Sequence, residues 1–180
     1  MDAISITGLQ ATGKTTLARA LGRALDAVVF SRDPLMDVLL ADGVPMVAAA
    51  DSGLSGIGQI GYDLQTALLR SQLAMNRSVI LECVVGDAQR AEWRAVAEAA
   101  GADFWLIDTV CSDPQLHRRR FQERGLTQRG DWVLEWETVE RNRQLFLPHP
   151  QTNYIADSAR PYEDNVRSIV QLIQHRGAEG

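Results

Sequence analysis

Lysine is nearly absent from this chain of 180 residues, because 17 of its 18 basic residues are arginines and only Lys14 is a lysine. The guanine-binding motif of Ras-like switches, Asn-Lys-x-Asp, needs a second lysine, so a GTP switch is excluded. Positive charge is also scarce overall, with a net charge of -5 and a pI near 5.2. Without an overall positive field, nucleic acid is disfavoured as a partner, although a local basic patch leaves it open.

Long apolar runs and a basic leader are also lacking. No run approaches the ~20 apolar residues needed to cross a bilayer, so no membrane association is expected. Residues 1–7 lack the basic start and small-residue cleavage site of a secretory signal, which predicts a cytoplasmic protein. Cysteine is scarce too, and the two residues present, Cys83 and Cys111, are consistent with that compartment.

What the chain does contain is an alternation of short apolar runs with helical patterns, which predicts an α/β fold with a parallel sheet. Its length fits one domain, residues 1–180. Five strands are expected, at Ala3–Gly8, Ala27–Ser31, Ser78–Val84, Asp103–Val110 and Thr152–Ala156. Helices are expected at about 13–25, 34–40, 58–76, 88–100, 114–124, 131–147 and 161–176, with a mobile loop at 41–57. Ser112-Asp113-Pro114 is a helix-start signal for the fifth of these helices.

Residues Gly8–Thr15 read Gly-Leu-Gln-Ala-Thr-Gly-Lys-Thr and match the P-loop pattern G-x-x-x-x-G-K-[ST] at every fixed position. They lie between an expected strand and an expected helix, where backbone N–H groups and the helix N-terminus bind phosphate. Lys14 is expected to reach the β- and γ-phosphates of a nucleotide, and the Thr15 hydroxyl to ligate Mg²⁺. The predicted nucleotide-binding residues of this segment are Gly8, Leu9, Gln10, Ala11, Thr12, Gly13, Lys14, Thr15 and Thr16.

Two further classes of P-loop protein are disfavoured. Leu54–Gln59 faintly matches the signature of transporter ATPases, but it falls in an expected loop of a chain too short for that fold. A AAA+ machine would need a helical lid domain after the core, and usually an acidic pair at the end of its Walker-B strand. Neither is visible in this sequence.

What remains is a class of small kinases of the nucleoside-monophosphate-kinase type, which the chain resembles over most of its length. The resemblance rests on Gly8–Thr15, Phe30–Asp33, the arginine-rich helix 114–124 and Ala156–Pro161. It is greatest for the group that includes polynucleotide 5′-hydroxyl kinases, chloramphenicol phosphotransferase, zeta toxins and predicted kinases described as AAA domains. It implies a three-layer P-loop fold, a five-stranded parallel sheet of order 2-3-1-4-5 with helices on both faces, and an arginine-bearing lid at 114–130.

That strand order also bears on the cysteines. The first strand would separate the two strands that end near Cys83 and Cys111, leaving them about 9 to 10 Å apart, which is too far for a disulfide. Both are therefore expected to be reduced thiols without metal.

In the kinases that the chain resembles, the acid after the second strand, Asp33 here, takes the proton from the hydroxyl being phosphorylated. The alternative is that Asp33 only caps a helix that starts at Pro34. Arg32 is expected to contact the acceptor or the nucleotide, the alternative being a solvated arginine. Glu82 is expected to bind acceptor or magnesium, the alternative being a carboxylate that only fixes neighbouring backbone.

The resemblance extends to three arginines and fails at one position. Arg120 and Arg124, one helical turn apart, are expected to close over ATP and stabilise the transferring phosphoryl group. Arg160 is expected to pack against the adenine, the alternative being a solvated turn residue. Met36 stands where polynucleotide kinases carry an arginine that orients the acceptor, which weakens the hypothesis of a 5′-end kinase.

Trp132 and Trp136 lie one turn apart in the expected helix 131–147 and are interpreted as core packing rather than an acceptor-stacking platform. The histidines have no acid partner in sequence and are interpreted as surface or cap residues. They are His117, His149 and His175.

The leading hypothesis is an ATP- and Mg²⁺-dependent kinase that phosphorylates a hydroxyl group of a small molecule. Asp33 would be the base, while Lys14, Thr15, Arg120 and Arg124 would serve the phosphates. One alternative is a polynucleotide 5′-hydroxyl kinase, and another is a non-catalytic or toxin-like ATP-binding regulator. A monomer or a homodimer is expected.

Overall fold

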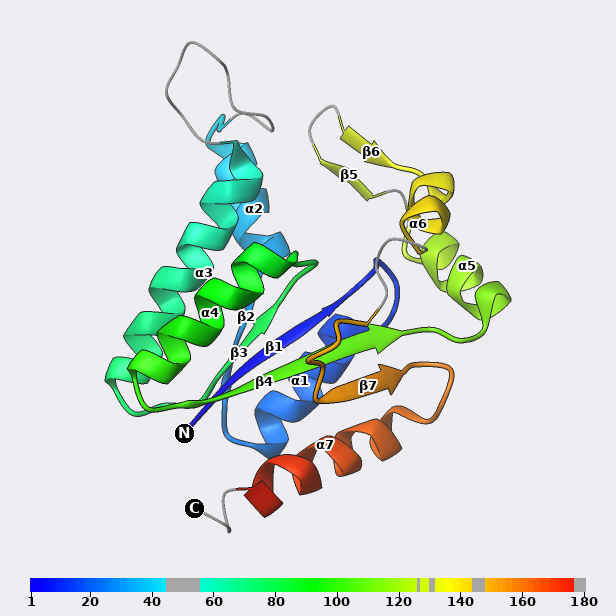
Figure 1. Ribbon diagram of the computed structural model, residues 1–180. Coiled ribbons are helices and arrows are strands. Elements are labelled where there is room, and N and C mark those ends of the chain that lie inside the picture. The colour runs from blue at the N-terminus through cyan, green and yellow to red at the C-terminus, as the bar shows by residue number, and fades with distance from the viewer. Residues whose placement is uncertain (45–55, 126, 130–131, 144–147, 177–180) are drawn as a thin grey trace.

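The computed structural model describes residues 1–44, 56–125, 127–129, 132–143 and 148–176. Five parallel strands form its central sheet (Figure 1): β1 (Asp2–Gly8), β2 (Val28–Ser31), β3 (Val79–Glu82), β4 (Asp103–Val110) and β7 (Tyr154–Asp157). A separate antiparallel hairpin consists of β5 (Thr127–Arg129) and β6 (Trp132–Leu134). The helices are α1 (Lys14–Ala24), α2 (Arg32–Ala41), α3 (Ile57–Ala74), α4 (Asp87–Ala99), α5 (Pro114–Glu123), α6 (Trp136–Arg143) and α7 (Tyr162–Arg176).

The strand order of the sheet is β2-β3-β1-β4-β7. This confirms the expected order 2-3-1-4-5, because β7 is the fifth strand of the sheet along the chain. Glu82, the last residue of β3, is in register with Ile6 of β1 and Ser31 of β2. The carboxyl ends of three neighbouring strands therefore meet at one edge of the sheet, and the P-loop follows β1 at that edge.

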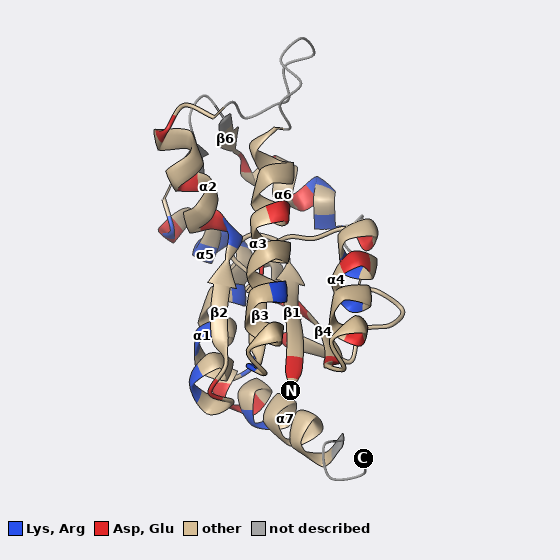
Figure 2. Cartoon of the chain, turned by 90° about the vertical axis from the view of Figure 1, so that its left-hand side faces the viewer, with Lys and Arg blue, Asp and Glu red and all other residues tan. Residues whose placement is uncertain are grey.

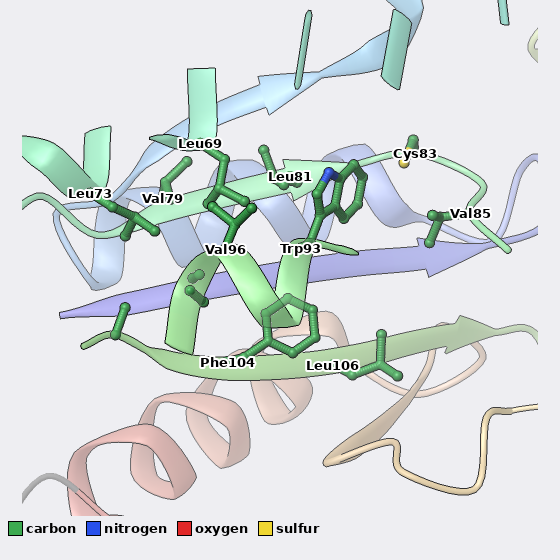
Figure 3. Close-up of a cluster of buried hydrophobic side chains, with 13 residues drawn as sticks. Leu69, Leu73, Val79, Leu81, Cys83, Val85, Trp93, Val96, Phe104 and Leu106 are labelled. Atoms are coloured by element: carbon green, nitrogen blue, oxygen red, sulfur yellow. The ribbon is translucent and has the colours of Figure 1, made fainter. Parts of the chain in front are cut away.

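Helices cover both faces of the sheet, as expected for a three-layer fold (Figure 1). Side chains alternate along β1, so that Ala3 packs in the cluster under α3 and α4, whereas Ile4 and Ile6 pack in the cluster under α1 and α7. Figure 3 shows the first cluster, in which Leu69 of α3 and Trp93 of α4 lie against the strands. Each face of the sheet therefore buries its own apolar layer.

A third and smaller apolar cluster lies beside the P-loop. Leu9 packs there with Leu134 of β6 and Val139 of α6, and these side chains are 6%, 3% and 0% exposed. Phe121 of α5 and Trp136 of α6 pack against them, with their ring centroids 5.6 Å apart. We call α5, β5, β6 and α6 together the lid unit. It shares this cluster with the P-loop, so the two are packed together.

The expected helix at 131–147 is wrong in its first part. Trp132 lies in β6, where it is in register with Arg129 of β5, and helix α6 begins only at Trp136. Trp132 and Trp136 therefore do not share one helical stripe, although Trp136 does pack against a core as expected. Tertiary pairing of short segments overrode a helical period in the sequence. Residues 144–147 lie outside the described part of the chain.

The expected start of α2 at Pro34 is also wrong. The helix begins at Arg32 and its N-cap position is Ser31, so Asp33 lies in the first turn rather than at the cap. Proline fits the first turn because the N–H groups there have no partner within the helix. Of the expected loop at 41–57, residues 45–55 lie outside the described part. None of the described helices is long and apolar enough to span a bilayer.

Candidate active site

The two glycines of the P-loop motif have separate structural causes. Gly8 has φ 145°, and a Cβ on it would lie 2.3 Å from the Thr109 carbonyl oxygen of the neighbouring strand β4. Gly13, the N-cap residue of α1, has φ 88°, a left-handed conformation that favours glycine. Helix α1 has no side-chain cap, so its first-turn N–H groups are available to an anion. The chain path therefore matches that of a phosphate-binding loop.

Lys14 is only 8% exposed, and its Nζ donates a hydrogen bond to the Leu9 carbonyl oxygen at 2.8 Å. Burial lowers the pKa of Lys14, while the carboxylates of Glu82 and Asp33 act in the opposite direction. Lys14, Asp33 and Glu82 come from three separate segments of the sequence. They therefore lie close enough together for the two carboxylates to act on the lysine. Both carboxylates help to keep the buried ammonium charged.

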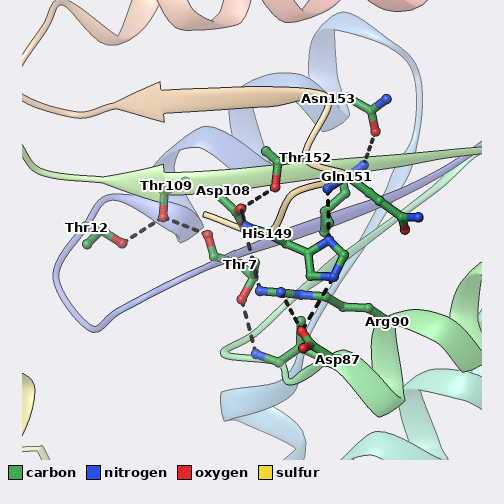
Figure 4. Close-up of polar contacts among 12 residues, drawn as sticks. Thr7, Thr12, Asp87, Arg90, Asp108, Thr109, His149, Gln151, Thr152 and Asn153 are labelled. Atoms are coloured by element: carbon green, nitrogen blue, oxygen red, sulfur yellow. Dashed lines mark hydrogen bonds and ion pairs between the residues drawn. The ribbon is translucent and has the colours of Figure 1, made fainter. Parts of the chain in front are cut away.

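A hydroxyl chain anchors the P-loop to the sheet, and the sequence did not indicate it. The hydroxyls of Thr12 and Thr109 lie 2.7 Å apart, and the Thr109 hydroxyl donates to the Thr7 carbonyl oxygen at 3.0 Å. Thr7, Thr12 and Thr109 are all labelled in Figure 4. Thr12 also donates to the Leu9 carbonyl at 2.7 Å. Through Thr12, a non-glycine position, the loop is thus attached to β1 and β4 of the sheet.

A hollow of about 400 Å³ lies in front of the P-loop. Among the described residues, four cationic side chains and no carboxylate line it: Lys14, Arg19, Arg120 and Arg124. The remaining lining residues belong to the P-loop and the start of α1: Ala11, Gly13, Thr15 and Thr16. The structure therefore brings both expected lid arginines to the P-loop. Arg19, one turn into α1 from Thr15, is an addition that the motif did not indicate.

A second hollow of about 430 Å³ adjoins the first and shares Gly13, Thr16 and Arg120 with it. It extends toward the start of α7, where Arg160, Pro161 and Tyr162 line it, so Arg160 lies in a hollow that adjoins the P-loop. Arg120 crosses between the hollows, donating from Nη1 to the carbonyl oxygen and the hydroxyl of Ser158, both at 3.0 Å.

On the other side of Lys14, Arg32 is held firmly and is not a freely solvated residue. Its guanidinium lies over the Tyr62 ring at 4.0 Å and donates to the Val84 carbonyl oxygen at 3.4 Å, and its buried Nε has no hydrogen-bond partner among the described residues. A Cβ on Gly61 would lie 3.1 Å from that Nε, so the glycine leaves room for the arginine. Glu82 is 5% exposed at the end of β3. Arg32, Asp33 and Glu82 thus occupy neighbouring strand ends.

The interpretation of the histidines as surface or cap residues is wrong for one of them. His117 is 1% exposed and contacts the P-loop, whereas His175 is exposed near the end of α7. His149 does have an acid neighbour in space, because its Nε2 lies 3.8 Å from an Asp87 oxygen. Figure 4 shows the network around it, in which Asp108 accepts from the His149 amide at 2.9 Å and lies 3.6 Å from Arg90.

Both cysteines are free, as expected, and both are buried. Burial raises the pKa of the Cys83 thiol to about 12, so it stays protonated at neutral pH. Within the described residues, no group of three or more His, Cys, Asp or Glu side chains is arranged to hold a metal by itself.

Comparison with known proteins supplies the family. Residues 4–149 match the AAA domain family. The chain belongs to that family. Over 170 residues it is 23% identical to a shikimate kinase from Burkholderia pseudomallei (strain 1710b), an alignment that covers 94% of this chain and 86% of that protein.

Solved structures supply the fold. A gluconokinase from Sinorhizobium meliloti 1021 has a TM-score of 0.66 at 14% identity, with 99% of this chain and 94% of that chain covered. An APS kinase from Mycobacterium tuberculosis, solved in complex with AMPPNP and APS, has a TM-score of 0.65 at 16% identity, with 96% and 97% covered. By family this chain is an AAA domain protein, and in fold it is similar to small P-loop kinases.

Proposed function

We propose that this protein transfers the terminal phosphoryl group of ATP, with Mg²⁺, to a hydroxyl group of a small molecule. The observation that carries the proposal is the hollow in front of the P-loop, where the described lining side chains include Lys14, Arg19, Arg120 and Arg124 and no carboxylate. Several cations around one helix N-terminus suit the charge of a triphosphate. The neighbouring hollow beside Arg160 would take the nucleoside.

The phosphate roles follow from chemistry at each position. Lys14 would exchange its bond with the Leu9 carbonyl for the β- and γ-phosphates, while the P-loop N–H groups hold the chain of phosphates. Arg120 and Arg124 would offset charge on the transferring group. Mg²⁺, when bound, would neutralise charge on the outer phosphates. Thr15 lines the hollow, and buried Glu82 lies at the adjacent strand end, so these two residues fit its protein-side ligands.

The acceptor would lie at the ends of β2 and β3, beside Asp33. A carboxylate at that edge can take the proton from a hydroxyl held in line with the γ-phosphate. Arg32 and Glu82, at the same edge of the sheet, would lie near the acceptor.

A small molecule is favoured over nucleic acid as the acceptor. The matched relatives are named as shikimate kinase, gluconokinase and APS kinase. Met36, where an end kinase would need an exposed arginine, is 7% exposed and apolar. Acidic and basic side chains are interspersed along α4 in Figure 2, so that helix presents no basic band to a phosphate backbone.

Transfer of labelled γ-phosphate tests the proposal. Wild-type protein would be incubated with Mg²⁺–ATP and a metabolite pool that contains the acceptors of the named kinases, with 5′-hydroxyl oligonucleotides in a parallel arm. We expect label only in the metabolite arm, and a loss of at least about 100-fold in Lys14→Ala, because one preorganised charge commonly contributes that much. The exposed Arg70→Ala on α3 serves as the control.

Three results would overturn the proposal. Label in the oligonucleotides would favour the end kinase, and bound ATP that turns over with no acceptor would favour a regulator. Transfer by Lys14→Ala at the wild-type rate would remove the P-loop from the reaction.

A further inference from the structure

The lid unit is joined to the P-loop by polar contacts as well as by the apolar cluster around Leu9. His117, in the second turn of α5, is buried between them. Its Nε2 lies 2.7 Å from the Gln10 carbonyl oxygen, and its Nδ1 lies 3.0 Å from Nη2 of Arg143 at the end of α6. The Trp136 ring meets the imidazole edge-on, with centroids 5.1 Å apart. Two variable positions of the motif, Leu9 and Gln10, therefore hold the lid unit.

The partners of His117 determine where its proton lies. A backbone carbonyl only accepts and a guanidinium only donates, so Nε2 must carry the hydrogen and Nδ1 must offer its lone pair. A neutral imidazole satisfies both partners at once. A doubly protonated ring would place an N–H of a cation against the Arg143 guanidinium, with no acceptor between them.

We propose that His117, as a neutral imidazole protonated on Nε2, is a positioning residue that joins Gln10 of the P-loop to Arg143 of the lid unit and thereby places Arg120 over the phosphates. Arg120 follows His117 by three residues, on the same side of α5, and lines both hollows. The proposal rests on the proposed function only for what the positioned arginine does. The junction itself is a property of the fold.

Charged groups on the elements around His117 shift its pKa and so determine the pH range in which the junction holds. Burial is the largest influence and lowers the pKa of His117, and Arg143 of α6 and Lys14 of α1 lower it further. The Gln10 carbonyl and Glu140 of α6 act in the opposite direction. Because the pKa in the folded state lies below the ordinary value, the neutral form is kept at neutral pH. The junction is lost only as the pH falls below the ordinary histidine range.

Imidazole nitrogen NMR tests the junction without any enzymatic activity. The chain has three histidines, so His117→Gln identifies the His117 signals by their disappearance, and the exposed His175→Gln is the matched control. We expect the Nε2–H tautomer for His117 and a titration below the ordinary histidine pKa. An Nδ1–H tautomer, or a titration at or above that ordinary value, would overturn the proposal.

Two substitutions separate the contact made by Nε2 of His117 from the contact made by its Nδ1. Glutamine can keep a donor near the Nε2 position, whereas asparagine can keep an acceptor near the Nδ1 position only. We expect His117→Asn to lower kcat/KM for ATP about tenfold or more. His117→Gln should keep most of the wild-type rate at neutral pH and should decline less at acid pH, since it has no imidazole to titrate.

Binding of a fluorescent ATP analogue and near-ultraviolet circular dichroism would show that each variant is folded. Equal kcat/KM in wild type and His117→Asn would overturn the positioning role, even where NMR confirms the junction. An inactive wild type with the expected NMR result would instead contradict the proposed function and leave the junction intact.

Discussion

The first turn of α2 bears on whether Asp33 is a base or only a helix cap. The alternative role, a helix cap, requires Asp33 at the N-cap, but that position belongs to Ser31. A carboxylate in the first turn still interacts favourably with the helix dipole, so it is stable there. It also lies near enough to Lys14 to oppose the effect of burial on the lysine pKa. The role of Asp33 as a base remains a prediction, which its position beside Lys14 supports.

Substitution of Asp33 by asparagine separates binding from transfer. Asp33→Asn should bind Mg²⁺–ATP nearly as well as wild type but lose about 10²- to 10⁴-fold in kcat, the usual contribution of a general base. Steady-state rates and ATP titrations would be measured together. The control is Asp26→Asn, the same change at an exposed turn residue with φ 49°, which asparagine tolerates. Wild-type turnover in Asp33→Asn would contradict a role as base.

At the scale of elements, the lid unit has a core of its own. Leu134 and Val139 pack on Leu9 in a cluster separate from the two apolar layers of the sheet. The hairpin and α6 are short, and short elements are stable mainly through such tertiary packing. Loss of that packing should therefore loosen the lid unit while leaving the sheet intact.

Leu134→Ala tests this separation. The substitution should lower the stability of the cluster around Leu134 by about 2 to 5 kcal/mol, the usual effect of truncating a buried leucine to alanine. Hydrogen exchange followed by mass spectrometry should show faster exchange in α6 and unchanged exchange in β1 and β4. Val133→Ala, at the adjacent position with a 42% exposed side chain, should leave α6 unchanged. Unaltered exchange of α6 in Leu134→Ala would mean that the cluster does not hold the lid unit.

At the scale of the whole molecule, both hollows are lined by residues from distant parts of the chain. Arg120 of α5, Ser158 after β7 and Gly13 of the P-loop line the hollow proposed for the nucleoside. A ligand that contacts all three binds the folded state alone, so its binding free energy adds to the free energy of unfolding.

Mg²⁺–ATP should accordingly raise the melting temperature. At a concentration of 100 Kd, binding adds about 2.7 kcal/mol, which corresponds to a rise of about 5 to 10 °C for a chain of this size. Differential scanning fluorimetry with a non-hydrolysable analogue would measure it, with Lys14→Ala as the variant that should show a much smaller rise. Equal shifts in the two proteins would place the nucleotide away from the P-loop.

Local and periodic features could be predicted from the sequence because they depend on neighbours along the chain. The P-loop motif is a strand, a turn and a helix start within a few residues, and the left-handed backbone of Gly13 at the helix start is a local requirement for glycine. The start of α5 is similarly local, since Asp113 accepts hydrogen bonds from the N–H groups of Gln115 and Leu116. Strand order followed from the resemblance to small kinases and is confirmed.

Only the tertiary structure decided the contacts between residues far apart in sequence. His117 has no notable neighbour along the chain, yet it bonds to Gln10, 107 positions away, and Thr109 meets Thr12 at a separation of 97. The hairpin that replaced the start of the expected helix depends on its packing against Leu9. The sequence by itself thus determined the phosphate-binding loop and the α/β class. The placement of the lid unit on that loop arose from burial and hydrogen bonding across the fold, which no local pattern encodes.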